Sequence, residues 1–305
     1  MLATSTNAMS DKAFSVSAPA SSANLGPGFD AVGIALNLRM TARVKPSRRF
    51  ALEFVGNETA PTHDGVEKLI ISAMHRISSK LPSVTIEVDN RIPLGKGLGS
   101  SAAAAALGLA IAARASHNRV SHKDLAELLC DIEGHPDNAL PAMYGGIIIA
   151  TDATSYLRFT PMPAMRIFVT IPELNFATAK ARKLLPDRYD RNDVVFASQH
   201  AALLGAALAS GEMAILGAAM QDRTHQPYRA KHIPGLTDAL AIEHRDLFGI
   251  ALSGAGPSLI AFTRPHANGA LSDRIEACFA KAGIPSRTIL LRPAMRGLRF
   301  TSNFG

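Results

Sequence analysis

Hydrophobic and polar positions along the chain follow two different periods, and this mixture predicts both strands and helices. Period-two alternation, or a short apolar run between turn residues, predicts strands over residues 14–18, 31–38, 41–45, 50–55, 84–88, 144–151, 156–160, 166–171, 249–253, 258–263 and 286–291. Helical spacing predicts helices over residues 66–81, 101–116, 121–133 and 266–282, with a helix-rich block over 177–244. Because strict βαβ alternation is absent, the pattern favours an α+β fold.

Three segments interrupt this pattern. Residues 19–29 are rich in Ser, Gly and Pro and predict a loop, and the sequence GHPDN at 134–138 predicts a turn. The sequence TPMPA at 160–164 is marked by proline and predicts a domain boundary. We therefore expect an N-terminal domain over residues 1–163 and a C-terminal domain over 164–305.

One stretch, residues 91–108, carries the strongest chemical signal and reads RIPLGKGLGSSAAAAALG. Its glycines reach positive φ easily, and an alanine-rich run with high helix propensity follows them. Ser100 is expected to cap this helix through its hydroxyl. A glycine loop that leads into a helix N-terminus offers free N–H groups and a positive dipole end, which predicts a phosphate site. The residues expected around the phosphate are Pro93, Gly95, Lys96, Gly97, Leu98, Gly99, Ser100 and Ser101.

Other interpretations of this loop fit less well. A Walker A motif requires a Lys before the serine, which is absent here. Residues 97–102 match GxGxxA, but they do not directly follow a strand, and no acidic residue ends a second strand downstream. A tight turn closing onto a buried alanine helix would explain the small residues but not the paired serines.

Composition narrows the class of protein. With 305 residues and 47% hydrophobic content, the chain can build a sizeable core. Cys130 and Cys278 stand in apolar, helix-like contexts, which predicts two buried thiols in a reducing compartment, and we expect a cytoplasmic location. Residues 1–12 lack the features of a signal peptide, and the longest apolar run is too short to span a bilayer. We expect no membrane partner.

The net charge of +7 raises the question of whether the protein binds nucleic acid. The basic residues are scattered, however, and the short basic patches lack interleaved aromatic residues for base stacking. We expect no nucleic-acid partner, and the positive charge equally suits an enzyme that handles ATP and a carboxylate.

Three motifs in order resemble those of the GHMP small-molecule kinases. PLGKGLGSSAA (93–103) resembles the second motif, and LSGAGPSLIAF (252–262) resembles the third. APASSANLGPGFDAVGIAL (18–36) resembles the first motif, in the NLGPGFD form of the branch that phosphorylates homoserine. The resemblance implies a ribosomal S5-like N-terminal domain and a ferredoxin-like C-terminal domain. It also implies ATP-dependent phosphorylation of the L-homoserine hydroxyl, a step in threonine biosynthesis.

The resemblance implies roles for four acidic or hydroxyl residues. Ser101 and Glu133 would bind Mg²⁺, which prefers hard oxygen ligands; alone, Glu133 would be an ordinary carboxylate at a helix end. Asp137 corresponds to the general base of members such as mevalonate kinase, and in the homoserine branch to a carboxylate that meets the substrate amine. Asp30, with Asn24, would bind the substrate and lie nearest its reacting hydroxyl. Whether a true base operates stays open.

The substrate carboxylate requires a cation, ideally an arginine. FATAKARKLLP (176–186) and QPYRAKHIPG (226–235) resemble two family segments and imply Arg182, with Thr178 one turn earlier, and Arg229. Taken alone, each arginine would be a solvated surface residue. Residues 63–70 lack the Asn that many members place near adenine, so the adenine contacts stay unassigned.

Several alternatives stay open. The chain could be a GHMP kinase for another small alcohol, a basic nucleic-acid-binding protein on an S5-like fold, or a Rossmann dehydrogenase. A homodimer is possible, although no interface pattern is visible.

Overall fold

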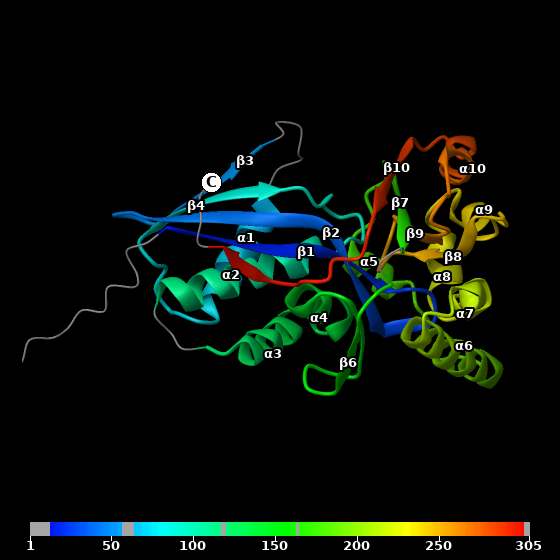
Figure 1. Ribbon diagram of the computed structural model, residues 1–305, viewed down its shortest axis with the longest axis horizontal. Helices are drawn as coiled ribbons and strands as arrows, with labels where there is room; N and C mark the ends of the chain where they lie inside the picture. Colours follow the sequence, from blue (N-terminus) through cyan, green and yellow to red (C-terminus); the bar gives the residue numbers. More distant parts are fainter. Residues whose placement is uncertain (1–12, 57–63, 117–119, 163–164, 302–305) are drawn as a thin grey trace, which may run out of the picture.

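The computed structural model describes residues 13–56, 64–116, 120–162 and 165–301. The predicted N-terminal tail (1–12) and residues 163–164 of the predicted boundary lie outside the described residues. Two β-sheets lie side by side along the long axis of the molecule, each with helices packed on it (Figure 1). This mixed arrangement confirms the predicted α+β class.

The N-terminal sheet has seven strands and is built around one long strand. Its strands are β1 (Phe14–Asn24), β2 (Gly28–Pro46), β3 (Ala51–Val55), β4 (Val84–Asn90), β5 (Ile147–Ala150), β6 (Tyr156–Phe159) and β11 (Arg299–Thr301). The order is β11-β1-β2-β4-β3; β5 also pairs with β2, and β6 with β5. β2 pairs with β4 over residues 40–46 and with β5 over 32–34. Because β2 also pairs with β1, this one strand belongs to three ladders, and it carries the first motif toward the second sheet.

Four helices pack on this sheet: α1 (Asp64–His75), α2 (Ser100–Ala115), α3 (His122–Glu133) and α4 (Pro136–Tyr144). The alanine-rich run predicted as a helix is α2, and its residues 102–113 are all buried. Its small side chains allow α1 to approach closely. A Cβ added at Gly108 would overlap the Ile70 carbonyl oxygen of α1. The alanines and this glycine therefore set the spacing between two core helices.

The C-terminal sheet is antiparallel, in the order β10-β7-β9-β8. Its strands are β7 (Arg166–Pro172), β8 (Leu247–Leu252), β9 (Leu259–Thr263) and β10 (Ser286–Leu291). The helices of this part are α5 (Thr178–Lys183), α6 (Arg191–Ser210), the 3₁₀ turn η1 (Met213–Ile215), α7 (Leu216–Ala219), α8 (Gln226–Ala230), α9 (Leu236–Leu240) and α10 (Gly269–Lys281). Helix α10 buries Leu271, Ile275 and Phe279 in a second apolar core.

After β10 the chain returns to the N-terminal sheet. The Asn37 N–H donates to the Arg292 carbonyl and the Ala294 N–H to the Ala35 carbonyl. Strand β11 then pairs with residues 15–17 of β1. The predicted division at residue 163 stays a prediction. The hydrogen bonds of residues 292 and 294 and the pairing of β11 with β1 show that residues 292–301 pack with the N-terminal sheet.

The predicted loop over residues 19–29 is wrong for most of its length. β1 continues to Asn24 and β2 begins at Gly28, so only residues 25–27 form the turn. A register shift between Pro19 and Ala20 accommodates the proline, and the small side chains of this segment are buried. Likewise, the two strands predicted over 31–38 and 41–45 form a single strand.

Two further predictions are corrected near the second motif. Ser100 does not cap α2: Gly99, at φ 66°, is the N-cap residue, and no side-chain hydrogen bond caps this helix. The predicted turn at GHPDN is limited to Gly134 and His135, because helix α4 begins at Pro136. Proline suits the first helical turn, where its missing N–H is not needed.

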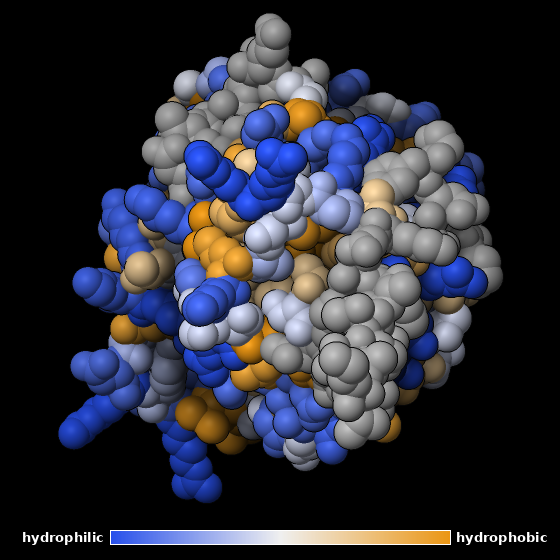
Figure 2. Space-filling model, turned by 90° about the vertical axis from the view of Figure 1, so that its left-hand side faces the viewer, coloured by the Kyte–Doolittle hydropathy of each residue, from blue (hydrophilic) through white to orange (hydrophobic). Residues whose placement is uncertain are grey.

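The surface of the molecule carries both hydrophilic and hydrophobic residues. Figure 2 shows the end of the molecule farthest from the C-terminal sheet, where hydrophilic residues project around a smaller apolar area. In the part of the chain that the structure describes, no helix is long and apolar enough to cross a membrane. Both cysteines are free and only partly buried, less than the sequence predicts.

Candidate active site

The three motifs meet at a cavity of about 250 Å³. All of the predicted site residues except Pro93 and Lys96 line it. These are Asn24, Asp30, Gly95, Gly97, Leu98, Gly99, Ser100, Ser101, Glu133, Asp137, Thr178, Arg182 and Arg229. Residues separated by more than two hundred positions therefore face one space, and both parts of the chain contribute to it.

Hydrogen bonds connect the motifs directly. The Ser253 hydroxyl of the third motif donates to the Gly97 carbonyl oxygen at 2.7 Å, and the Gly254 N–H donates to the Ala23 carbonyl at 3.0 Å. Gly97 has φ 74°, and a Cβ there would overlap the Ser253 carbonyl oxygen. A glycine is therefore required where the second motif packs against the third.

The N-terminus of α2 opens onto the cavity. Ser100 and Ser101 form its first turn, which contains no acidic residue. In the described structure the first intrahelical bond runs from the Ala103 N–H to the Gly99 carbonyl, and no side chain caps the helix. The first N–H groups and the positive end of the helix dipole are thus directed toward a potential anion.

A hydroxyl and a carboxylate meet beside this helix end. The Ser101 Oγ donates to Glu133 Oε2 at 3.0 Å. Burial raises the pKa of Glu133, while the Ser101 hydrogen bond acts in the opposite direction. A partly buried carboxylate with one hydroxyl partner fits a divalent cation, because a cation compensates the charge that burial disfavours. The donor set therefore suits Mg²⁺.

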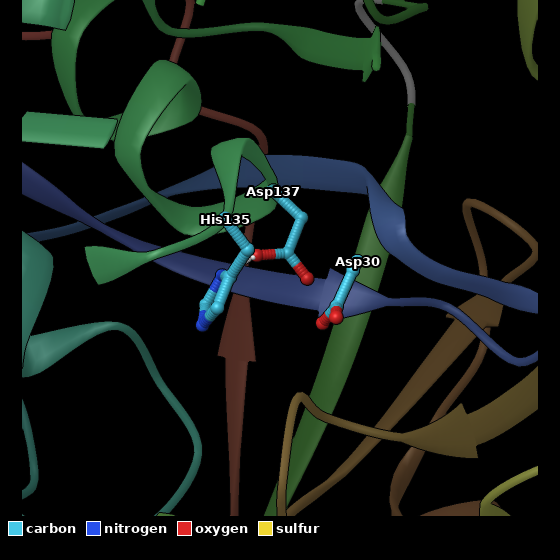
Figure 3. A group of neighbouring side chains, drawn as sticks. All are labelled: Asp30, His135 and Asp137. Atoms are coloured by element: carbon cyan, nitrogen blue, oxygen red, sulfur yellow. Dashed lines mark hydrogen bonds and ion pairs between the residues drawn. The ribbon is translucent and has the colours of Figure 1, made fainter. Parts of the chain in front are cut away.

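Three titratable side chains converge in the same cavity (Figure 3). One ligating atom each of Asp30, His135 and Asp137 lies within 4.8 Å of the other two. Nδ1 of His135 donates to Asp137 Oδ1 in a short hydrogen bond, which is the main cause that raises the pKa of His135. Asp137 is only 1% exposed. Two carboxylates at close range attract a cationic group such as an ammonium.

Two arginines stand at the other end of this group. Arg182 Nη2 lies 2.7 Å from Asp30 Oδ1, and Arg229 Nη1 donates to the Gly254 carbonyl at 3.0 Å. Both guanidinium groups lie 5.5 Å from the centre of the Phe29 ring. Burial, together with the nearby Arg182, lowers the pKa of Arg229 to about 10. A pair of like charges this close suits an anionic ligand such as a carboxylate.

The predicted phosphate contact of Lys96 is not supported by its position. Its ammonium donates to the Pro172 and Leu174 carbonyls at 3.0 and 2.8 Å, and it does not line the cavity. Pro93 also lies outside the lining. Lys96 instead connects the second motif to the end of β7.

The sequence analysis missed several lining residues, including Phe29, Asn138, Ala255 and His135. His135 belongs to the GHPDN sequence that predicts a turn, and a lone His next to a Pro has no catalytic or metal-binding spacing. The sequence did offer one indication that His135 belongs to the site, because it lies between Glu133 and Asp137, which are both predicted site residues. Placement of all three at the α3–α4 junction brings His135 to the cavity.

Models of protein families match both halves of the chain. Residues 68–146 match the N-terminal domain of the GHMP kinases, and residues 204–281 match the GHMP kinase C-terminal domain. The chain belongs to the GHMP kinase family. The resemblance read from the three motifs is thereby confirmed.

Individual proteins and solved structures are also similar to this chain over most of its length. A homoserine kinase from Deinococcus radiodurans is 40% identical over 257 residues, covering 82% of this chain and 84% of the relative. A homoserine kinase from Solibacter usitatus is 37% identical over 296 residues, covering 94% and 97%. The crystal structure of a homoserine kinase from Cytophaga hutchinsonii matches with a TM-score of 0.81 at 24% identity, over 99% of this chain and all of that one. Methanococcus jannaschii mevalonate kinase shares the fold at a TM-score of 0.67 and 17% identity, covering 92% of this chain and 98% of that one.

Proposed function

We propose that this chain is a homoserine kinase, which transfers the γ-phosphoryl group of ATP to the side-chain hydroxyl of L-homoserine. GHMP kinases use ATP, and the homoserine kinases named above match nearly the whole chain. The observation that carries the proposal is that two different binding environments line one cavity of about 250 Å³. One is an uncapped helix N-terminus, and the other consists of paired carboxylates and paired arginines.

The amino-acid end of the substrate fits the second environment. Arg229 and Arg182 provide cations for the α-carboxylate, and Thr178 lies one helical turn before Arg182 on the cavity wall. Asp137 provides a buried carboxylate for the α-ammonium group. Neutral alcohols and sugars would leave these charges without partners, which disfavours their binding.

The hydroxyl end fits Asn24 and Asp30. The Asp30 N–H donates to Asn24 Oδ1 at 3.0 Å, so the turn holds the Asp30 side chain toward the cavity. A carboxylate is a weak base toward a primary alcohol, so the Asp30 carboxylate takes the hydroxyl proton late in the transfer. Phosphoryl transfer depends mainly on positioning and charge neutralisation, which this arrangement provides.

The phosphate groups fit the glycine loop and the N-terminus of α2. Ser101 and Glu133 would hold Mg²⁺, and when bound the ion neutralises charge on the phosphate oxygens. The backbone of residues 95–99 leaves room for phosphates because it carries few side chains. The possible homodimer and the cytoplasmic location stay predictions.

ADP release from Mg-ATP tests the proposal. L-homoserine is compared with L-serine, L-threonine and mevalonate, and with two truncated substrates: 3-amino-1-propanol lacks the carboxylate, and 4-hydroxybutanoate lacks the amine. We expect homoserine to have the highest kcat/KM, and each truncation to reduce it by at least about tenfold, because a charged hydrogen bond is lost. Equal or faster turnover of mevalonate would reject the substrate while keeping the family. ATP hydrolysis without any alcohol sets the baseline.

A further inference from the structure

A buried chain of hydrogen bonds runs behind the arginine side of the cavity, from Asp222 through His225 to Arg229. The Asp222 side chain is fully buried, and its oxygens accept the backbone N–H groups of residues 224–226 at 2.7 to 2.9 Å. These bonds fix the chain at the start of α8. Asp222 therefore holds the backbone of His225 in place.

The imidazole of His225 uses both of its nitrogens. Nε2 lies 2.8 Å from the Gly26 carbonyl oxygen, and Nδ1 lies 3.0 Å from Arg229 Nη1. A carbonyl only accepts and a guanidinium only donates, so Nε2 carries the hydrogen and Nδ1 accepts. Burial lowers the pKa of His225, which favours this neutral form.

On one side, His225 supports the turn that binds the substrate hydroxyl. Gly26 lies in this turn, between Asn24 and Asp30, which have φ values of 70° and 55°. Such values are unfavourable for side-chain-bearing residues and persist only where the surroundings impose them. The Phe29 ring also packs on the imidazole, with ring centres 5.3 Å apart. His225 thus contacts the turn through a hydrogen bond and a ring.

On the other side, His225 orients the guanidinium of Arg229. Nη1 is held by two acceptors, the His225 ring and the Gly254 carbonyl. The residue is only 2% exposed, and among the described residues its Nε has no hydrogen-bond partner. An unpaired buried N–H is unfavourable, so a carboxylate in the cavity would satisfy it. The His225 ring therefore fixes the orientation in which the Arg229 guanidinium can bind a ligand.

We propose that His225 is a positioning residue that fixes the separation between the hydroxyl-binding turn and the carboxylate-binding Arg229, and thereby selects the length of the hydroxy amino acid. One rigid ring touches both structures, so the distance between the two ends of the substrate depends on it. This inference rests on the proposed function and adds to it a determinant of substrate length.

The test measures KM and kcat for a series of alcohols in wild type, His225→Leu and His225→Gln. L-serine is one methylene shorter than L-homoserine, and 5-hydroxy-L-norvaline is one longer. We expect His225→Leu to raise the KM for homoserine about tenfold and to reduce the preference for homoserine over both neighbours. The KM for ATP should stay within about twofold. His225→Gln, whose amide can donate and accept, should recover most of the preference.

Two controls separate positioning from general damage. The substrate 3-amino-1-propanol has no carboxylate for Arg229, so its kcat/KM should change far less than that of homoserine. In Arg229→Ala, adding His225→Leu should raise the KM for homoserine by a smaller factor than it does in the wild type, because part of its effect acts through Arg229. If His225→Leu does not fold, His225→Asn replaces it, since its shorter amide cannot reach both partners.

The outcomes distinguish this inference from the proposed function. Absence of homoserine turnover in the wild type refutes the proposed function. Turnover in the wild type, with unchanged KM and preference in His225→Leu, refutes only the role of His225. Equal losses for homoserine and 3-amino-1-propanol, or additive effects in the double variant, also overturn it.

Discussion

Gly97→Ala tests whether the glycine loop of the second motif is held in place by the third motif. Gly97 has φ 74°, and an added Cβ would overlap the Ser253 carbonyl oxygen and lie 2.9 Å from Gly256 N. The backbone would have to move, and the hydrogen bond from the Ser253 hydroxyl to the Gly97 carbonyl at 2.7 Å would weaken. Gly95 is the matched control, because it has a similar φ of 65° but nothing within 4 Å of its added Cβ.

The structure sets the size of the difference between the two variants. An alanine in the left-handed region costs about 1–2 kcal/mol at either position. At Gly97, overpacking adds about 1–3 kcal/mol, and the weakened hydrogen bond adds about 1 kcal/mol. Gly97→Ala should therefore lower the free energy of unfolding by roughly 2–4 kcal/mol more than Gly95→Ala.

Urea unfolding followed by circular dichroism measures this difference, as a shift of the midpoint at constant slope. If both alanines destabilise the protein equally, then the left-handed backbone alone explains the effect. In that case the contact between the second and third motifs does not hold the loop, and the argument is wrong.

Three further predictions concern the cavity. Glu133→Gln and Ser101→Ala should each raise the Mg²⁺ concentration for half-maximal activity by at least about tenfold; an unchanged Mg²⁺ titration would exclude them as ligands. Arg182→Ala should raise the KM for homoserine about tenfold, yet change the free energy of unfolding by less than about 1 kcal/mol, because its ion pair with Asp30 is partly exposed; a large loss of stability by urea unfolding would contradict this. The pKa of His135 is raised in the fold by its carboxylate partner, so the stability from this pair is complete below its unfolded pKa near 6.5 and is lost as pH rises through the higher folded value. The stability difference between wild type and His135→Gln should shrink between pH 6 and pH 9, and a difference that is independent of pH would refute this.

Much of the glycine loop and of helix α2 could be predicted from the sequence, because their conformation depends on local preferences. Gly95, Gly97 and Gly99 all adopt positive φ, and the alanine run forms the buried helix α2. Short-range propensity determines such features. The error at Ser100 has the same origin: a serine is a good cap on average, but here Gly99 occupies the cap position.

Long-range packing explains what the sequence did not show. The segment after Pro19 has loop-like composition, yet it is a buried strand because β2 pairs with it and a register shift accommodates the proline. His225 carries no motif spacing, and its role depends on Gly26, which lies 199 positions away. Lys96 is attractive as a phosphate ligand in the sequence, and only the fold reveals the carbonyls that bind it.

The return of β11 to the first sheet has a consequence for synthesis on the ribosome. Strand β11 pairs with residues 15–17 of β1. The first strand of the sheet to be synthesised therefore completes its pairing only after one of the last described segments of the chain has been made. Until residues 299–301 emerge, that side of β1 is an open edge, and open edges can pair with other chains. The whole second sheet is translated during this interval. Folding of the N-terminal sheet therefore cannot finish co-translationally before the second sheet has been made.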